Sequence, residues 1–478
     1  MFYWEEKMEY DVIIVGSGPT GYMCAYRLKE KNPNLKILVI DRGKDITQRV
    51  CPVLTHKLSV CPKTKKGTGC IPSCSMTTGF GGAGAFSDGK FNITTQFGGW
   101  LTDYIGEDTL LNLIDYCDQV NLKFGASKVL TDPYTDEVRK IEQRAIGVGL
   151  MLLRAKVRHL GTEENLKILS RIKRHLDEEG VQFIFEKAVS DITIKDGKVN
   201  GVILEDGTSF EGKNVVLGVG REGSTFLEKM LTSHGVAFVN NQVDIGVRVE
   251  TSNVVMQDIN KYLYEGKFVF NTPQGTLVRT FCSNPSGHVV IENDDGVILA
   301  NGHSYNDPKL GSNNTNFALL VSHKFSEPFS DPNQFAKDVA SLANRLACGS
   351  VIVQKYGDLK RGRRSTPKRI AQGFVNPTLK EAVPGDLGLC LPYKTLISII
   401  DMIEALDHVT PGIANEHTLL YGVEAKFYSA RPITDNNLEV RGISNLYCGG
   451  DGAGMTRGLA QAGASGVWIA DNILKEGK

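Results

Sequence analysis

No stretch of this sequence approaches the roughly 20 consecutive apolar residues that a helix needs to cross a bilayer. The sequence also lacks an excess of either charge, because Lys and Arg total 54 and Asp and Glu total 54. A neutral chain has no overall electrostatic attraction to nucleic acid or to a membrane, so neither is expected as a partner. The first residues, MFYWEEKMEYD, have no basic region followed by an apolar one. We therefore expect no secretion signal and a cytoplasmic protein.

The ten cysteines include no CxxC pair, although four of them fall within residues 51–74: Cys51, Cys61, Cys70 and Cys74. Their spacing could hold a tetrahedral zinc ion or an iron–sulfur cluster. An irregular loop with free or buried thiols explains them equally well. A pair that cycles between thiols and a disulfide is a third interpretation, and the sequence leaves the three open.

The first feature that is present is the stretch DVIIVGSGPTG, residues 11–21. Its apolar residues predict a buried strand that runs into Gly16-x-Gly18-x-x-Gly21 and then into a helix. In such a turn Gly16 permits the sharp bend, Gly18 lets the backbone approach a diphosphate, and Gly21 lets the helix pack closely on the strand. The helix N-terminus, with Pro19 and Thr20 in its first turn, then offers N–H groups and a partial positive charge to phosphates.

The residues after the third glycine complete a dinucleotide-binding pattern. Residues 22–31 can form the helix, and a second strand, residues 36–40, ends in Asp41. An acid at this place binds ribose hydroxyls, which favours FAD or NAD over NADP, although Arg42 lies beside it.

A glycine-rich stretch, GFGGAGAFSDGK, occupies residues 79–90. It cannot be a stable helix, and such a loop lets backbone N–H groups crowd a flat or anionic ligand. A flexible turn is the alternative. We interpret it as a loop that contacts the cofactor through Gly82, Gly84, Ser87, Asp88 and Lys90.

The next part of the chain is predicted to contain helices and then a β-meander. Residues 107–153 have helical periodicity, and Thr162 is expected to cap a helix that ends near Gly180. A strand at 181–185 precedes three further strands at 189–194, 199–204 and 209–219, which two Asp-Gly turns separate.

The last meander strand leads into a second glycine pattern, Gly218-x-Gly220-x-x-Gly223, followed by a helix-like segment. One interpretation is a separate NAD(P)H site, with Asp244 as its acid. Polar residues interrupt the strand that should precede Asp244, so we favour a closing strand of the first domain.

From about residue 240 to residue 417 the sequence changes to short β-like segments rich in Asn, Ser, Gly and Pro, which predicts a substrate-binding domain. Candidates to face a pocket there are Arg248, Arg279, His288, Asn301, His303 and Tyr305. One dense basic run, residues 360–369, could bind a carboxylate or phosphate, form an exposed face or contact RNA.

The C-terminal part contains another motif that is suited to anion binding. Residues 446–451 predict a short strand that ends in a Gly-Gly-Asp turn, and residues 452–458 lead into a helix from about Leu459 to Lys475. An acid at a glycine turn followed by a helix N-terminus complements the first glycine turn.

Together these motifs resemble the flavoprotein superfamily of the glutathione reductase type, in which FAD lies across a two-part Rossmann domain. The GSGPTG turn with Asp41 looks like its first FAD motif, residues 215–220 (VVLGVG) like the second and residues 448–454 (CGGDGAG) like the third. Gly218 and Val219 replace the usual Ala and Thr of the second motif. More narrowly, the chain is similar to a family of uncharacterised FAD-dependent dehydrogenases, through GFGGAGAFSDGK, VDIGVRVE, RTFC, NGHSYND and GDGAGMTRGLAQA.

The resemblance implies FAD as the cofactor and suggests which residues hold it. It implies that the three glycines of the first turn meet the diphosphate, Asp41 the adenosine ribose, the backbone of Val189 the adenine edge, and Asp451 the diphosphate–ribityl region. The helix near Leu459 would direct its N-terminus at the flavin pyrimidine ring. Further cofactor contacts are expected at Arg42, Gly218, Gly220, Gly450, Gly458, Leu459 and Ala460. The Cys-x4-Cys pair of the disulfide reductases is absent, so that chemistry is not predicted.

The expected fold is α/β, with a discontinuous Rossmann-type FAD-binding domain made of residues 1–50, 145–235 and 420–478. Residues 51–144 are expected to form a Cys/Gly-rich loop and a helical segment over the cofactor. An inserted mixed β/α substrate domain covers residues 236–419.

The predicted function is hydride transfer between FAD and a small anionic organic substrate. NAD(P)H or an electron-transfer protein are open as electron donors, and the oligomeric state is not specified. Proton transfer is expected from His288, His303 or Tyr428, and anchoring of the substrate from Arg431 or the Arg363–Arg364 pair. Two other classes stay as alternatives: a flavin-dependent RNA-modifying enzyme, and a redox or metal sensor built on the four clustered cysteines.

Overall fold

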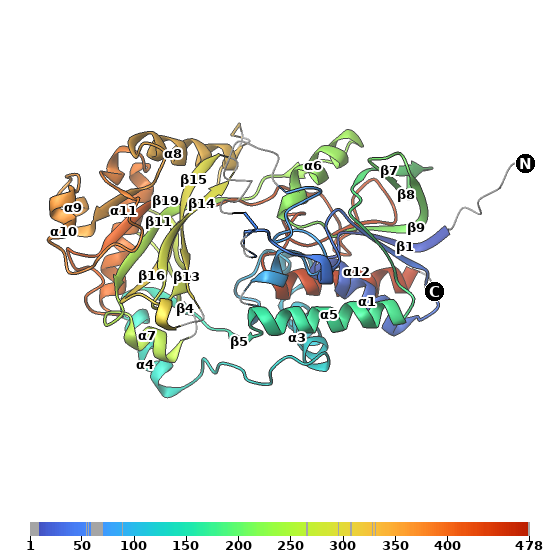
Figure 1. Ribbon diagram of the computed structural model, residues 1–478, viewed down its shortest axis with the longest axis horizontal. Helices are drawn as coiled ribbons and strands as arrows, with labels where there is room; N and C mark the ends of the chain where they lie inside the picture. Colours follow the sequence, from blue (N-terminus) through green and yellow to red (C-terminus); the bar gives the residue numbers. More distant parts are fainter. Residues whose placement is uncertain are drawn as a thin grey trace, which may run out of the picture. The chain divides into compact units, whose positions relative to one another are not determined.

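The computed structural model describes residues 9–53, 55, 57–58, 70–87, 89–263, 266–294, 296–305, 308–326, 328–329 and 331–476. The chain forms two compact units (Figure 1). Unit 1 contains Met1–Leu130, Ala155–Asn240 and Ser429–Lys478, and unit 2 contains Thr131–Arg154 and Asn241–Tyr428. The chain therefore leaves unit 1 and returns to it twice, as an α/β domain with an insertion does.

A parallel arrangement of three strands forms the centre of the main sheet of unit 1. β1 (Glu9–Val15) lies between β2 (Ile37–Asp41) and β9 (Ser209–Leu217), parallel to both. Residues 12–15 are at most 6% exposed. A parallel strand is covered on both faces, which explains why this part of the sequence is continuously apolar rather than alternating.

The remaining strands of this sheet extend it on both sides. The order is β6-β2-β1-β9-β8-β7, with β21 also pairing with β9. β6 (Gln182–Phe185) is parallel to β2, whereas β8 (Lys198–Leu204) and β7 (Val189–Lys195) form the antiparallel meander. β21 (Leu446–Cys448) is parallel to β9. The meander and the closing strand are thus as predicted.

Two helices of unit 1 pack unusually closely. α1 (Pro19–Lys31) contacts α12 (Leu459–Glu476), and Figure 1 shows them running next to each other. A Cβ on Gly466 would lie 2.0 Å from the carbonyl oxygen of Thr20, so only glycine permits this approach. The hydroxyl of Thr20 donates a hydrogen bond to the carbonyl of Ala462 at 2.9 Å. The N-terminal parts of the two helices are thereby fixed to each other.

Further elements surround this centre. Those of unit 1 are η1 (Ile46–Gln48), η3 (Gly82–Phe86), β3 (Lys90–Ile93), α2 (Thr102–Ile105), α3 (Glu107–Lys123), β5 (Lys156–His159), α5 (Thr162–Glu178), η4 (Arg221–Gly223), α6 (Ser224–Ser233), β10 (Phe238–Val239) and β20 (Arg431–Pro432). A buried ion pair joins two of them: Arg158 of β5 donates from Nε and Nη2 to the Asp118 carboxylate of α3, at 2.6 and 2.7 Å. β3 pairs with β5, and β10 pairs with β20.

Unit 2 is built on an eight-stranded sheet of order β18-β17-β19-β11-β16-β13-β12-β4. The strands are β4 (Leu150–Leu153), β11 (Val243–Ser252), β12 (Lys267–Asn271), β13 (Leu277–Asn284), β16 (Asn314–His323), β17 (Ile352–Lys355), β18 (Val383–Pro384) and β19 (Leu419–Lys426). A separate hairpin consists of β14 (His288–Asp294) and β15 (Val297–His303). Alternate residues of β11 differ in kind: Val243, Ile245, Val247 and Val249 join the core, and Asp244, Arg248 and Glu250 are buried on the other face.

The helices of unit 2 pack on this sheet. They are α4 (Asp136–Ile146), α7 (Gln257–Tyr262), α8 (Pro332–Leu346), α9 (Tyr356–Lys360), α10 (Pro367–Ala371) and α11 (Tyr393–Asp407), with η5 (Pro308–Leu310) and η6 (Leu387–Leu389). Both α8 and α11 contact β11, and Figure 1 labels them beside it. The sequence predicted a mixed β/α domain here, but it identified only short β-like segments and assigned no individual helix. α8 has apolar residues at helical spacing and an N-cap, Asp331, whose side chain accepts from the amide of Gln334.

Three local predictions were wrong. Helical periodicity was assigned as far as residue 153, but residues 150–153 form β4, which pairs with β12 because its apolar side chains complete the sheet of unit 2. The segments 145–154 and 420–428, both expected in the FAD-binding domain, belong to unit 2. α5 begins at Thr162 itself, with Gly161 at φ +70° as its N-cap.

Among the residues that the structure describes, no helix has both the length and the hydropathy required to cross a membrane.

Candidate functional site

The glycine turn after β1 is dictated by backbone packing. Gly16 has φ +100°, a conformation that favours glycine, and a Cβ on it would lie 2.7 Å from the carbonyl oxygen of Gly218. A Cβ on Gly21 would lie 1.9 Å from the carbonyl oxygen of Gly16. The turn therefore lies directly against the end of β9, and the helix starts directly on the strand.

The N-terminus of α1 is lined by backbone alone. Gly18 is its N-cap residue and supplies no side-chain hydrogen bond, and Pro19 follows at the first helical position. On the neighbouring glycine loop, Gly82 has φ +61° and a Cβ there would lie 3.4 Å from Cα of Gly18. The surface beside the uncapped N–H groups thus has the shape and polarity that a diphosphate needs.

Asp41 lies at the end of β2 and is 7% exposed. Its Oδ2 accepts from the amide and the hydroxyl of Ser17, at 2.8 and 2.7 Å, and its Oδ1 accepts from the amide of Gly43 at 2.7 Å. The carboxylate thus fixes the glycine turn to β2. Because a carboxylate offers about four acceptor positions, one remains for a ribose hydroxyl. Arg42 pairs with Glu222 at 3.6 Å on the half-exposed surface nearby.

Arg49 is a buried cation that the sequence analysis missed. It is 4% exposed, and its guanidinium donates to main-chain carbonyls of Ser75, Met76, Phe80 and Gly82 at 2.6–3.0 Å. Burial lowers its pKa to about 10, against the opposing effect of nearby Asp41. No motif contains this residue, and a lone arginine in an irregular segment gives no signal in the sequence.

The glycine loop that Arg49 holds packs on the first glycine turn and on α12. The amide of Gly81 donates to the carbonyl of Ser17 at 2.9 Å, and a Cβ on Gly84 would lie 2.2 Å from the side chain of Leu459. The hydroxyl of Ser87 and the amide group of Asn165 each donate to the carbonyl of Gly84 at 2.8 Å. Lys90 begins β3, and Asp88 lies outside the described residues.

The second and third motifs meet the first at Thr20. The amide of Gly218 donates to the carbonyl of Val15 at 2.9 Å, which seats the end of β9 on β1. Gly450 has φ +81°, and a Cβ on it would lie 2.5 Å from Oγ1 of Thr20. Gly220, in contrast, has open space around its Cα.

Asp451 shapes the turn that leads into α12. Its carboxylate accepts from the hydroxyl of Thr456 at 2.7 Å and from the amide of Gly458 at 3.3 Å. Desolvation raises its pKa above the ordinary value of an aspartate. Gly458 follows with φ +86°, and Leu459 and Ala460 open α12. Val189, the other expected contact, begins β7, two residues after Lys187, whose amide donates to the carbonyl of Asp41 at 3.3 Å.

Most of the candidate catalytic residues lie in unit 2, and Arg431 lies in unit 1. His288 and His303 face each other across the β14–β15 hairpin, and both rings pack edge-on against Tyr305, at 5.5 and 4.7 Å between centroids. A ring nitrogen of His288 lies 2.9 Å from the carbonyl of Leu310.

Tyr428 belongs to a buried polar network at the start of β11. Its hydroxyl donates to the carboxylate of Asp244 and accepts from Arg279, at 2.9 Å for the latter. Asp244 is fully buried and also accepts from Arg279 and from the hydroxyl of Ser322. The phenol is thus held between a carboxylate and a guanidinium.

Several basic side chains in the run at residues 360–369 form ion pairs with acidic side chains. Arg363 pairs with Asp358 at 2.7 Å, Arg361 pairs with Glu416 at 3.0 Å, and Lys360 pairs with Glu404. Arg364 is exposed, and its carbonyl accepts from Arg369 at 2.9 Å.

Of the four clustered cysteines, Cys51, Cys70 and Cys74 are half-buried, and Cys61 lies outside the described residues. No group of three or more His, Cys, Asp or Glu side chains within the described ranges is arranged to hold a metal ion.

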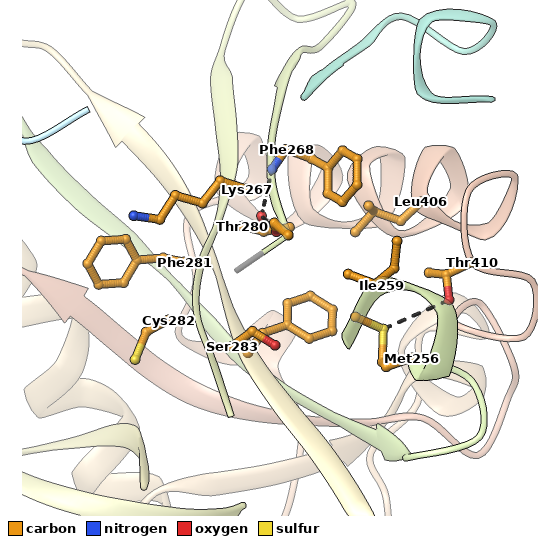
Figure 2. A pocket seen from close by; sticks show the side chains of 12 residues that line it. Met256, Ile259, Lys267, Phe268, Thr280, Phe281, Cys282, Ser283, Leu406 and Thr410 are labelled. Carbon is orange, nitrogen blue, oxygen red and sulfur yellow. Dashed lines mark hydrogen bonds between the residues drawn. The ribbon is translucent and has the colours of Figure 1, made fainter. Parts of the chain in front are cut away.

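A narrow cavity in unit 2 is lined by residues of β12, β13 and β16 on one side and of α7 and α11 on the other. Figure 2 shows Met256, Ile259, Phe268, Leu406 and Thr410 around it. Its volume is about 10 Å³, on the scale on which a single water needs roughly 10–15 Å³. The cavity is therefore too small for an organic substrate.

Three family descriptions match parts of this chain. "Pyridine nucleotide-disulphide oxidoreductase" matches residues 141–255, "Thi4 family" residues 1–46, and "FAD-dependent protein, C-terminal domain-like" residues 242–427. The first of these includes the β-meander and β9, the second the first glycine turn, and the third most of unit 2.

Among curated proteins, an uncharacterized protein of Clostridium beijerinckii is 26% identical over 98% of this chain and 82% of its own length. The mitochondrial electron transfer flavoprotein-ubiquinone oxidoreductase of Arabidopsis thaliana is 47% identical over 45 residues, 9% of this chain and 7% of that protein.

Solved structures are similar over 98% of this chain. L-proline dehydrogenase from P. horikoshii has a TM-score of 0.38 at 12% identity over 94% of its chain. Formate oxidase from Aspergillus oryzae has a TM-score of 0.45 at 14% identity over 98% of its chain. Glycine oxidase from Bacillus cereus has a TM-score of 0.32 at 14% identity over 95% of its chain.

The match to the Thi4 family covers the first glycine turn and the uncapped N-terminus of α1, and the oxidoreductase match covers the meander strands of the unit 1 sheet. The residues present fit a dinucleotide, because backbone alone lines the place where its diphosphate is expected. The protein is an FAD-dependent oxidoreductase with a Rossmann-type α/β fold.

Proposed function

We propose that this FAD-dependent oxidoreductase, a member of the glutathione reductase-type superfamily, transfers a hydride between FAD held by unit 1 and a small anionic organic substrate. The observation that carries the proposal is the glycine-lined cradle at the N-terminus of α1. Four glycines expose main-chain atoms there, and a side chain at any of them would contact neighbouring backbone or occupy the space beside it: Gly16, Gly18, Gly82 and Gly450. Such a surface is suited to a diphosphate.

The cofactor contacts proposed for this chain follow the motifs. Gly16, Gly18 and the N–H groups of α1 hold the diphosphate, and Asp41, with one acceptor position left, holds the adenosine ribose. Asp451 binds the ribityl region. When bound, FAD supplies a ring that accepts or donates a hydride.

The protein contributes electrostatic stabilisation at both ends of the cofactor site. The N-terminus of α12, an 18-residue helix, carries a partial positive charge that favours a negatively charged ring system. Arg49 adds a full positive charge beneath the glycine loop. Its four carbonyl partners keep this charge in place without neutralising it by a carboxylate contact.

An anionic substrate is supported by Arg431. Its side chain is 21% exposed, and its closest acidic group, Asp103, is 3.8 Å away and 62% exposed. The Nε of Arg431 is buried without a hydrogen-bond partner among the described residues. A guanidinium with an unused donor is suited to a carboxylate.

For proton transfer we propose Tyr428, with His288 and His303 as alternatives. The phenol of Tyr428 donates to Asp244 and accepts from Arg279, so it can pass a proton to the carboxylate and regain one while the guanidinium keeps its position. Tyr428→Phe removes the proton and keeps the ring. We expect it to slow substrate turnover without loss of bound flavin, whereas unchanged turnover would shift the role to the histidines.

The test of the central proposal is an anaerobic visible spectrum of the purified protein, recorded during addition of NADH and then NADPH. We expect a flavin absorption band that one of these donors bleaches. A flavin band that neither donor bleaches points to an electron-transfer protein as donor or to a substrate that is itself oxidised by the flavin. A protein that has no such band and binds no added FAD would disprove the proposal.

A further inference from the structure

Two arginines of unit 1 gather around one tryptophan. The guanidinium carbon of Arg431 lies 5.6 Å from the centroid of the Trp100 ring, and that of Arg457 lies 5.1 Å from it. Both distances are within the range of a cation–π interaction. The C-terminal segment thus brings two positive charges to an indole that lies far away in the sequence.

The backbone holds this group rigidly. The amide of Trp100 donates to the carbonyl of Met455 at 2.8 Å, and the amide of Arg457 donates to the carbonyl of Gly98 at 2.6 Å. Gly99, at φ +125°, lies so close to the 455–457 segment that a Cβ would be 2.6 Å from Cα of Thr456. On the other side, Arg431 belongs to β20, which pairs with β10.

The same region contains polar atoms that the described residues do not satisfy. Nε of Arg431 is one of them. Another is Oε1 of Gln461, in the first turn of α12, on a side chain that is 1% exposed. The Gln461 carboxamide lies beside Gly98, whose Cβ would be 3.1 Å from Nε2. A buried polar atom without a partner costs free energy, and this cost is relieved when a ligand provides the partner.

We propose that Arg431, Arg457 and Gln461, arranged around Trp100, form the recognition site for an organic acid that carries an N–H or O–H donor besides its carboxylate. The proposal rests on the proposed function and specifies its substrate class. The two guanidinium groups bind the carboxylate, for which their planar donor pattern is suited. The Gln461 carbonyl accepts from the N–H or O–H group. The indole keeps both guanidinium groups oriented when no acid is bound.

The test is isothermal titration calorimetry of the FAD-loaded protein with three probes: lactate, propionate, and lactamide, which lacks the charge. We expect lactate to bind most tightly, propionate more weakly and lactamide at least about tenfold more weakly than lactate. Arg431→Met and Arg457→Met should each weaken lactate and propionate about tenfold or more and leave lactamide unchanged. Arg441→Met, at an exposed position of the same C-terminal segment, is the matched control.

Two further variants separate the roles. Gln461→Met should remove the preference for lactate over propionate without weakening propionate. Asp103→Asn removes the exposed carboxylate nearest to Arg431 and should tighten carboxylate binding about two- to threefold, because a competing anion is lost.

The outcomes distinguish this inference from the proposed function. Flavin-loaded protein that binds lactamide as tightly as lactate, or whose arginine variants bind lactate like the parent, overturns the inference and leaves the flavin function intact. Inorganic phosphate that binds tenfold more tightly than lactate overturns the choice of a carboxylate. Protein that never retains FAD overturns the proposed function instead.

Discussion

At the scale of single residues, the charges that organise unit 1 lie where no motif predicts them. Arg49 and Arg158 are 4% and 2% exposed, yet their partners differ in kind. Arg158 meets the carboxylate of Asp118, whereas Arg49 donates to main-chain carbonyls and lies over the ring of Phe86. An ion pair cancels its charge locally. Arg49 therefore leaves a positive potential beside the glycine loop, and a bound diphosphate is suited to compensate it.

Arg49→Lys is expected to weaken FAD binding about tenfold or more. Lysine keeps the charge, but its single ammonium cannot donate to four carbonyls at once, so the glycine loop loses its fixed shape. The measurement is a titration of the apoprotein with FAD, followed by flavin fluorescence. Arg174→Lys, at an exposed position on α5, is the control and should keep the parental affinity. Equal affinity of both variants would show that Arg49 has no role in forming the loop.

Gly21→Ala should destabilise unit 1 by about 3 kcal/mol, because its Cβ would lie 1.9 Å from the carbonyl oxygen of Gly16 and neither backbone can move without disturbing β1. Gly220→Ala is the matched control: Gly220 has φ −79° and open space, so stability should change by less than about 0.5 kcal/mol. Thermal unfolding checks both. A Gly21→Ala protein as stable as the control would contradict the close packing of α1 on the turn.

At the scale of elements, three glycine turns converge on the start of α1, and each joins two segments that are distant in sequence. The turn after β1 lies against Gly218, the turn before α12 lies against Thr20, and the glycine loop lies against Gly18. The absence of side chains permits these close approaches. In unit 2 the corresponding connections are made by side chains, such as that of His323 at the end of β16.

His323 should make unit 2 sensitive to mild acid. It is partly buried, and a ring nitrogen lies 3.0 Å from the hydroxyl of Thr395 on α11. Desolvation lowers its pKa, with Asp244 acting in the opposite direction and Lys394 in the same direction. Since its pKa is lower in the folded than in the unfolded state, its contribution is complete above about pH 6.5. That contribution is lost as the pH falls from there through the folded pKa.

The difference in melting temperature between the parent and a His323→Gln variant should therefore decrease between pH 7.5 and pH 5. A constant difference for His323→Gln would contradict the effect of burial on this histidine. Differential scanning calorimetry at several pH values provides the measurement.

At the scale of the whole molecule, the two units have separate cores. The core of unit 1 is built around β1, α1 and α12, and that of unit 2 around β11, α8 and α11. The proposed cofactor contacts all belong to unit 1, although they come from its three separate stretches of chain. Binding of the cofactor should thus stabilise the packing of these three stretches against one another.

Hydrogen exchange tests this consequence. At a free FAD concentration of 100 times Kd, the folded state gains about 2.7 kcal/mol relative to the unfolded state. The amides of β1, β2 and β9 should exchange more slowly when FAD is added, since these strands bear the glycine turn and Asp41. The amides of β16 in unit 2 serve as the internal reference. Protection that appears in β16 and not in β1 would contradict a cofactor site centred on the first glycine turn.

The sequence by itself determined those features that depend on local chemistry. Gly16, Gly18 and Gly21 predicted a strand, a turn and a helix, because the backbone conformation and close packing of that turn demand glycine within a few residues. The two Asp-Gly turns predicted the β-meander, and the glycine-rich residues 452–458 predicted the start of α12. The family matches are consistent with the FAD chemistry that these motifs suggested.

Only the tertiary structure decided which distant residues share a region. Residues 150–153 look helical beside α4 and become β4, because their apolar side chains complete a sheet whose other strands all begin at Val243 or later. Arg49 acquires its role from four carbonyls of a loop that follows it, and Trp100 acquires two arginines from the C-terminal segment. Burial and long-range contact create these roles, and neither leaves a periodic or local pattern in the sequence.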